Sequence, residues 1–199
     1  MYQSFQSFRK KTAILTCLLL ALGTVAFAQV KYSFKENASL VVSGTSTLHD
    51  WTMKSGSTAG DVTVVFDASG KITDIQNVQF TTVVDALKSG KGGMDKNAYN
   101  ALLKEKNPNI TFNSSNVTVT AVGANHYQIK SIGALTIAGT TKDVELLAKA
   151  TLNADKTIVI EGSKKINMKD FGVKPPSFMM GTIKTGENIT LQFTVPLGK

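Results

Sequence analysis

The stretch Ile189-Thr190-Leu191-Gln192-Phe193-Thr194-Val195 decides the fold class of this chain. Apolar and polar residues alternate in it without a break, which is the pattern of a β-strand with one buried face. The same alternation returns along the chain, in residues 32–34, 40–42, 62–66, 117–121, 127–137, 144–150 and 158–160, and residues 72–84 are long enough for one bent strand or two. We therefore expect a mainly β protein of about eight to ten strands.

Residues 94–104 depart from this alternation. Their apolar side chains recur at helical spacing, at Met94, Ala98, Tyr99, Leu102 and Leu103. The helix must end before Pro108, because the residue before a proline avoids the helical region. One short α-helix near 94–104 is thus predicted. Neither a repeat of fixed period nor a linker divides the chain, so a single domain is expected.

Many short antiparallel strands with one helix are typical of a β-sandwich or a closed barrel. Both architectures stay open at this point, and closure favours an extended antiparallel β-barrel of about eight strands because it removes exposed strand edges. The interior of such a barrel is just wide enough for side chains or for one small ligand. Periodicity alone does not distinguish a filled core from a cavity.

The first 28 residues have the features of a secretory signal peptide. An apolar run at 12–22 follows three basic residues, and Ala26-Phe27-Ala28 supplies the small residues that precede a cleavage site. The run is too short to span a bilayer comfortably. Cleavage before Gln29 would leave a domain of residues 29–199, exported to the periplasm or secreted. Cys17, the single cysteine, lies in the apolar run, so the exported domain would have neither a thiol nor a disulfide.

The formal charge of the chain is +8, from 22 basic and 14 acidic residues, and loss of the three basic residues near the N-terminus leaves 19 against 14, or +5. The remaining lysines are scattered and form no dense basic stretch interleaved with aromatic residues. Such a charge is typical of a solvated surface. Nucleic acid is therefore not an expected partner, whereas transient contact with an anionic membrane surface is compatible with this charge.

The stretch Gly44-Thr45-Ser46-Thr47-Leu48-His49-Asp50-Trp51 contains serine, histidine and aspartate, the residue types of a hydrolytic triad. Adjacent side chains in an extended segment point in different directions, so Asp50 is badly placed to orient the imidazole of His49. We expect His49 and Trp51 to pack at a barrel end and Asp50 to accept turn amides. His126 is far from His49 in sequence, and no carboxylates have ligand spacing, so we predict no catalytic residue, metal site or cofactor.

Residues 168–181 form the most unusual stretch of the chain. Pro175 and Pro176 exclude a central strand, so a loop or an edge segment is expected. Yet the stretch also carries two phenylalanines and three methionines, at Met168, Phe171, Phe178, Met179 and Met180. These adaptable apolar side chains suit a plug at the barrel end or part of a ligand mouth, and a lid would be both.

Five segments, taken in order, carry a resemblance to a known family. They are residues 44–51, Gly93-Met94-Asp95, Asn107-Pro108-Asn109-Ile110-Thr111-Phe112, residues 133–142 and residues 168–181. Together they resemble the YceI-like family of exported lipid- and polyisoprenoid-binding proteins, over essentially the whole mature chain. The resemblance implies a lipocalin-like antiparallel barrel with a helix at one side and a hydrophobic tunnel for an apolar chain. One departure is His-Asp-Trp at 49–51, where many members have a Lys-His pair in a different setting, so no particular head group is inferred.

The predicted function is to bind, and to sequester or carry, a long-chain polyisoprenoid, isoprenoid quinone or fatty-acid-like lipid inside the barrel, without catalysis. Each CH₂ group moved from water into such a tunnel contributes about 0.8 kcal/mol. The predicted ligand contacts are Leu40, Val42, His49, Trp51, Val64, Phe66, Phe80, Phe112, Leu135 and Ile137, with Phe171, Phe178, Met179 and Met180 at the mouth. Two alternatives stay open, namely a periplasmic structural or interaction barrel with a filled core, and a hydrolase that uses His49.

Overall fold

The computed structural model describes residues 27–199, in which the chain forms eleven strands and one α-helix. The strands are β1 (Ala28–Phe34), β2 (Ser39–Ser46), β3 (Trp51–Ser55), β4 (Thr58–Phe66), β5 (Ile72–Val83), β6 (Asn109–Ala121), β7 (His126–Ile137), β8 (Thr140–Leu152), β9 (Ile158–Asn167), β10 (Ser177–Phe178) and β11 (Ile183–Gly198). The helix is α2 (Gly92–Ala101), and three 3-10 turns are η1 (Val84–Ala86), η2 (Met168–Phe171) and η3 (Met179–Gly181).

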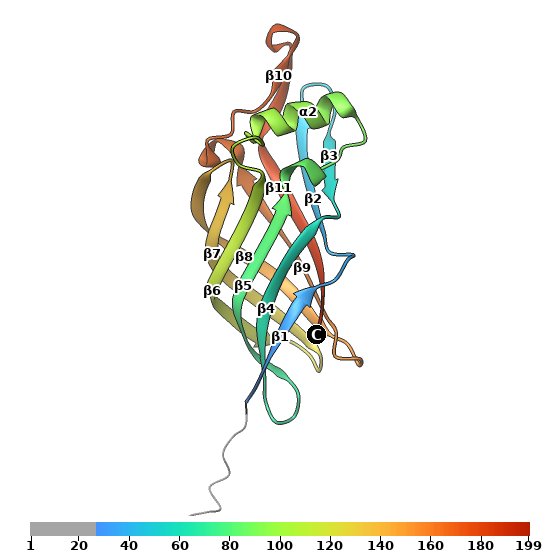
Figure 1. Ribbon diagram of the computed structural model, residues 1–199, viewed down its shortest axis with the longest axis vertical. Coiled ribbons are helices and arrows are strands. Elements are labelled where there is room, and N and C mark those ends of the chain that lie inside the picture. Colours follow the sequence, from blue (N-terminus) through green and yellow to red (C-terminus); the bar gives the residue numbers. More distant parts are fainter. Residues whose placement is uncertain (1–26) are drawn as a thin grey trace, which may run out of the picture.

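Eight of the strands close into an antiparallel barrel (Figure 1). Their order is β1-β4-β5-β6-β7-β8-β9-β11, and β11 returns to β1 through the pairs Ser33–Gly198 and Phe34–Leu197. Closure pairs the two edges that an open sheet of these strands would expose. The predicted mainly β fold, an antiparallel barrel of eight strands with one helix, is confirmed.

The hairpin of β2 and β3 lengthens the wall at the end of the barrel where α2 lies (Figure 1). β2 pairs with β11 between Thr185 and Thr194, beyond the short contact of β11 with β1. β1 and β2 therefore share one edge of the long strand β11. β3 continues the sheet and bridges to the segment after η1 through Lys54 and Lys88.

Two local features have clear backbone causes. The turn between β7 and β8 consists of Ala138 and Gly139, whose φ angles of 49° and 81° are both positive, as a two-residue type I′ hairpin requires. The helix occupies Gly92–Ala101 instead of the predicted 94–104. It ends early because Leu103 adopts a left-handed conformation with φ of 54°, which a continuing helix does not allow.

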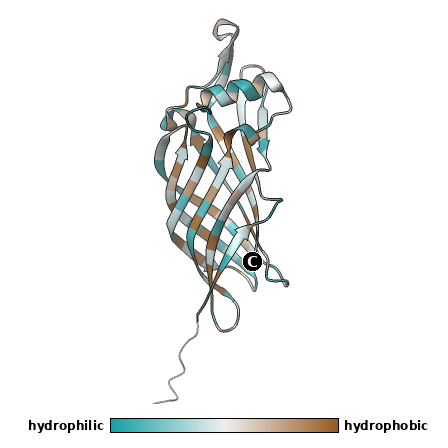
Figure 2. Cartoon of the chain, viewed as in Figure 1, coloured by the Kyte–Doolittle hydropathy of each residue, from teal (hydrophilic) through white to brown (hydrophobic). Residues whose placement is uncertain are grey.

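Buried apolar side chains form two clusters along the barrel. The upper cluster lies at the α2 end and includes Leu40, Met53, Leu87, Ile110, Phe112, Leu135, Ile137, Ile166 and Phe171. The lower cluster lies at the other end and includes Tyr32, Val62, Val64, Phe66, Ile75, Tyr127, Ile129, Ile158 and Leu197. Figure 2 shows the alternation behind both clusters, as hydrophobic residues interrupted by polar ones along each strand.

The predicted signal peptide, residues 1–28, lies outside the described residues except for its last two positions. Among residues 27–199, no helix combines the length and the apolar character that crossing a membrane requires.

Candidate ligand-binding cavity

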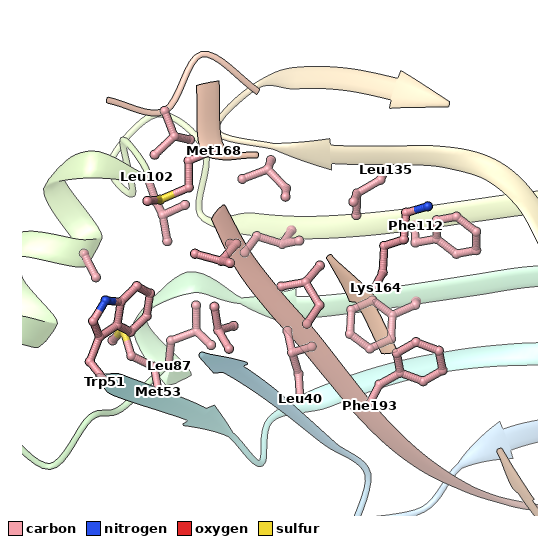
Figure 3. Close-up of a pocket in the computed structure, with 18 of the residues that line it drawn as sticks. Leu40, Trp51, Met53, Leu87, Leu102, Phe112, Leu135, Lys164, Met168 and Phe193 are labelled. Atoms are coloured by element: carbon pink, nitrogen blue, oxygen red, sulfur yellow. The ribbon is translucent and has the colours of Figure 1, made fainter. Parts of the chain in front are cut away.

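A cavity of about 430 Å³ runs through the upper cluster and reaches the edge of the lower cluster. Its volume lies within the range of small-molecule sites, roughly 300–1,000 Å³. All eight barrel strands, the β2–β3 hairpin and α2 contribute side chains to its wall. Figure 3 shows these side chains converging from strands that are distant in sequence. The interior of the barrel is therefore partly open instead of close-packed throughout.

The cavity opens at the α2 end of the barrel. Leu48 and His49, in the turn between β2 and β3, are exposed to solvent and also line the cavity. Lys91, immediately before α2, and Pro176, before β10, border the same rim. The mouth is thus formed by loops and by one face of a short helix. These parts of a barrel can move without breaking the hydrogen bonds between its strands.

The opposite end of the barrel is filled by its own side chains. Tyr32 and Tyr127 are 0% and 1% exposed. The hydroxyl of Tyr32 donates to the carbonyl oxygen of Lys156 at 2.9 Å, and the hydroxyl of Tyr127 accepts the backbone amide of Ile72 at 3.2 Å. Burial raises the pKa of Tyr32 above its ordinary value, so the phenol stays neutral and remains a donor. The lower cluster therefore forms a floor beneath the cavity.

Eight of the predicted contact residues lie on the cavity wall, namely Leu40, Val42, His49, Trp51, Phe80, Phe112, Leu135 and Ile137. Positions two apart on a strand share a face, which explains why alternation places Leu40 with Val42, and Leu135 with Ile137, on this wall. Figure 3 shows Leu40, Trp51, Phe112 and Leu135 around one space, although they come from four different strands. Their contact with a ligand stays a prediction.

Four predicted residues lie away from the wall, and these placements are corrected. Val64 and Phe66 are buried in the lower cluster, where neighbouring side chains fill the barrel. Phe171 is buried in the upper cluster without bordering the cavity. Met180 is fully exposed in the hairpin between β10 and β11. For Val64 and Phe66, alternation reports which face a residue occupies but not its depth along the barrel. Phe171 and Met180 were predicted from the apolar composition of a loop, which does not report where each of its side chains points. The side chains of Phe178 and Met179, also predicted at the mouth, lie outside the described residues.

Several wall residues were missed by the sequence prediction. Leu191 and Phe193 share the inward face of β11 with Ile189 and Val195. The period-2 pattern of this strand therefore contained the signal for them. Met94 lies in α2, Met168 lies in η2, and Leu87 immediately follows η1. No local sequence pattern reports that these segments cover the barrel end.

The turn in Gly44–Trp51 is built around Ser46 and not, as predicted, around Asp50. The hydroxyl of Ser46 accepts the backbone amides of Leu48 and His49, at 3.2 and 3.1 Å, and donates to the carbonyl oxygen of His49 at 2.7 Å. The Nδ1 atom of His49 lies 2.7 Å from the backbone oxygen of Asp50, not from its carboxylate. Serine, histidine and aspartate are therefore arranged as a turn and not as a catalytic triad.

Gly44 and Trp51 are paired across β2 and β3. A Cβ atom on Gly44 would lie 2.5 Å from Cζ2 of Trp51, so the indole ring packs directly against the glycine backbone. The indole nitrogen also donates to the carbonyl oxygen of Thr45 at 3.0 Å. The glycine and this hydrogen bond hold the ring at the cavity wall.

Asp95 and Tyr99 fasten α2 over the cavity. The Oδ1 atom of Asp95 accepts the hydroxyl of Ser89 at 2.6 Å and the backbone amide of Ser89 at 2.8 Å. These two bonds stabilise the carboxylate and hold the pKa of Asp95 below its ordinary value. The hydroxyl of Tyr99 donates to the carbonyl oxygen of Leu87 at 2.9 Å and accepts the Lys88 ammonium at 2.8 Å.

The family model of the YceI-like domain matches residues 24–197. The chain belongs to the YceI-like family. A search of curated proteins found no match.

Solved structures share the YceI-like fold at low sequence identity. BcnA from Burkholderia cenocepacia is 20% identical, with a TM-score of 0.61, and the match covers 79% of this chain and 95% of that one. A polyisoprenoid-binding domain from Saccharophagus degradans, implicated in plant cell wall breakdown, is 12% identical, with a TM-score of 0.60 and coverage of 83% and 97%. A YceI protein from Campylobacter jejuni is 20% identical, with a TM-score of 0.53 and coverage of 69% and 80%. At these identities the likeness establishes the shared fold.

Proposed function

We propose that this YceI-like protein binds one long-chain apolar molecule inside its barrel and sequesters or carries it without changing it chemically. The observation that carries the proposal is the cavity of about 430 Å³, enclosed by the barrel strands and open at the α2 end. Candidate ligands are a polyisoprenoid, an isoprenoid quinone and a fatty-acid-like lipid. The Saccharophagus degradans relative, described as a polyisoprenoid-binding domain, supports this ligand class.

The wall supplies the free energy of binding. Most of its side chains are aliphatic or aromatic, among them Leu40, Leu87, Phe80, Phe112 and Phe193. Roughly ten CH₂ groups at about 0.8 kcal/mol each would contribute several kcal/mol after the costs of association are subtracted. The thioethers of Met53, Met94 and Met168 add flexible surface near the mouth, which suits chains of irregular shape.

We also propose that binding takes place outside the cytoplasm, because residues 1–28 have the features of a signal peptide. The exposed side chain of Leu48 and the ammonium of Lys91 lie at the mouth, and together they suit brief contact with an anionic membrane surface during lipid exchange.

Two other functions are less well supported. The open interior favours ligand binding over a barrel with a filled core. The hydrogen bond from His49 to a backbone oxygen, instead of to the Asp50 carboxylate, favours binding over hydrolysis.

Copurified lipid tests the proposal directly. Protein purified from its native host is extracted with organic solvent and analysed by mass spectrometry, in parallel with native mass spectrometry of the intact protein. Ala148 lines the cavity, so Ala148→Phe should fill part of it and lower the bound lipid at least tenfold. The expected result for the unmodified protein is a stoichiometric long-chain lipid.

Leu147→Phe is the matched control, because Leu147 is adjacent on β8 but points outward and is 59% exposed. It should retain the lipid. The proposal fails if the unmodified protein is free of lipid and takes up no added isoprenoid, or if Ala148→Phe carries as much lipid as Leu147→Phe.

A further inference from the structure

Two polar side chains interrupt the apolar wall at mid-depth. Ser131 on β7 and Lys164 on β9 both line the cavity. Ser131 follows Ile129 of the lower cluster and precedes Leu135 of the upper cluster on the same face of β7. These two polar groups therefore lie where the two clusters meet, well below the mouth.

The hydroxyl of Ser131 lacks a partner. Ser131 is 6% exposed, and its Oγ atom is fully enclosed without a hydrogen bond to any described residue. A buried hydroxyl without a partner costs roughly 1–3 kcal/mol, so native proteins seldom keep one. A ligand atom that accepts a hydrogen bond from Ser131 would remove this cost.

Lys164 faces inward on a strand whose next residue faces water. Lys164 is half-buried and lines the cavity together with Ile160 of the same strand, whereas Lys165 is exposed. Figure 3 shows the Lys164 side chain projecting among the apolar wall residues. Among the ion pairs of the described residues, none involves Lys164. An ammonium group in an apolar interior is costly unless it is paired, so its position calls for an anionic partner.

Strand register brings the two groups to the same level. Ser131 pairs with Leu146, and Leu147 pairs with Ser163, so Leu146 lies beside Lys164 in the next row. Two strand spacings separate the Ser131 and Lys164 backbones by roughly 10 Å, and the flexible four-carbon stem of a lysine reaches across part of this gap. Both donors can therefore approach one head group.

The charged side chains that line the cavity are all basic. Lys91 and Lys164 line the cavity, and among residues 27–199 no aspartate or glutamate does. The acidic residue next to Leu146, Glu145, points outward and is held by Lys130 at 2.7 Å. The strong interaction with Lys130 holds the pKa of Glu145 below its ordinary value, and Lys164 contributes least to this shift. The interior thus favours an anion over a cation.

We propose that Lys164 and Ser131 bind the carboxylate head of a single-chain fatty acid, whose tail extends toward the α2 end. The ammonium and the hydroxyl can each donate to one of the two carboxylate oxygens, and charge-assisted bonds of this kind are strong in a desolvated site. The tail then occupies the apolar upper part of the cavity, since the lower cluster fills the other end. The inference rests on the proposed function and narrows it to an anionic, single-chain ligand.

Binding of chain-matched ligands to the delipidated protein tests the inference. Calorimetry at pH 8 compares hexadecanoate, methyl hexadecanoate and hexadecyl phosphate. The unmodified protein should bind hexadecanoate at least tenfold more tightly than the methyl ester. Lys164→Met should reduce this preference to within twofold, and Ser131→Ala should weaken hexadecanoate binding about threefold or more.

Lys165→Met is the matched control, since it removes the same charge from the outer face of β9. It should keep the full preference for hexadecanoate. Equal affinity for acid and ester in the unmodified protein, or an undiminished preference in Lys164→Met, overturns the inference while apolar binding stands. Tighter binding of hexadecyl phosphate than of hexadecanoate overturns the carboxylate assignment. Failure of all three ligands to bind overturns the proposed function as well.

Discussion

Small residues shape the cavity wall at individual positions. Gly44 leaves room for the indole of Trp51, and Gly162 leaves room for the ring of Phe193. Both rings line the cavity. A Cβ atom at either glycine would collide with the ring that packs on it, because the available distances are shorter than van der Waals contact. The aromatic part of the wall therefore depends on glycines in neighbouring strands.

Gly44→Ala tests this dependence. The added methyl group must push the indole of Trp51 away, so we expect a loss of about 1–3 kcal/mol in the free energy of unfolding, as is typical of overpacking. Trp51 is the single tryptophan of the chain, so its fluorescence should also shift as the ring moves. Urea unfolding followed by fluorescence measures both effects.

Gly56→Ala provides the comparison, because a Cβ atom there would meet nothing within 4 Å. It should change the free energy of unfolding by less than about 0.5 kcal/mol. Equal destabilisation by both substitutions would show that the contact between Gly44 and Trp51 has no special importance.

At the scale of elements, α2 is held over the cavity by the hydrogen bonds of Asp95 and Tyr99 and by apolar side chains packed on the upper cluster. It is short, and Ser89 and Asp95 connect it to the loop that precedes it. Helices of this length are marginal by themselves, so the side-chain anchor matters more than helix propensity. Because α2 contributes to the rim, its attachment controls how readily the mouth can widen.

The stability contributed by Asp95 should depend on pH. Its pKa is lowered in the folded protein by Ser89, so the stabilisation is present at neutral pH and is lost as pH falls below about 3.9 toward the lowered value. Asp95→Asn should therefore lower the melting temperature at pH 7, and the difference from the unmodified protein should shrink below pH 4. Calorimetric melting curves from pH 2 to pH 7 measure this difference. A gap that stays constant over the whole range would contradict the assigned role.

Much of the wall was predictable from sequence because β-strands encode it in a period of two. Leu40, Val42 and Leu135 were found in this way. Val64 follows the same alternation yet lies in the floor, since depth depends on how the strands are staggered and not on the strand itself. The sequence pattern also did not reveal that Leu87 lines the cavity, because its position depends on how η1 folds against the barrel.

At the scale of the whole molecule, one end of the barrel is close-packed and the other end contains the cavity. The lower cluster is packed around Tyr32 and Tyr127 and closes the barrel. The upper cluster surrounds an open cavity and is covered by a helix and loops (Figures 1 and 3). A close-packed end can supply stability that an end with an unfilled interior does not, since a cavity forfeits dispersion contacts.

Tyr32→Phe should lower the stability of the protein without changing the amount of lipid that it binds. It removes the hydrogen bond to Lys156 in the floor, so we expect a loss of about 0.5–1.5 kcal/mol in the free energy of unfolding. Lipid content should stay unchanged, because Tyr32 does not line the cavity. Urea unfolding and extraction of bound lipid measure the two quantities. A large loss of lipid with little change in stability would contradict this division.

The dependence of affinity on chain length measures whether the barrel interior binds an apolar chain, because an apolar channel accepts the ligand one CH₂ group at a time. Delipidated protein is titrated with unbranched fatty acids of increasing length, with the fluorescence of Trp51 or calorimetry as the readout. Affinity should rise about fourfold for each added CH₂ group, corresponding to about 0.8 kcal/mol, until the cavity is full, and should then level off. An affinity that does not change with chain length would show that the chain does not bind inside the barrel.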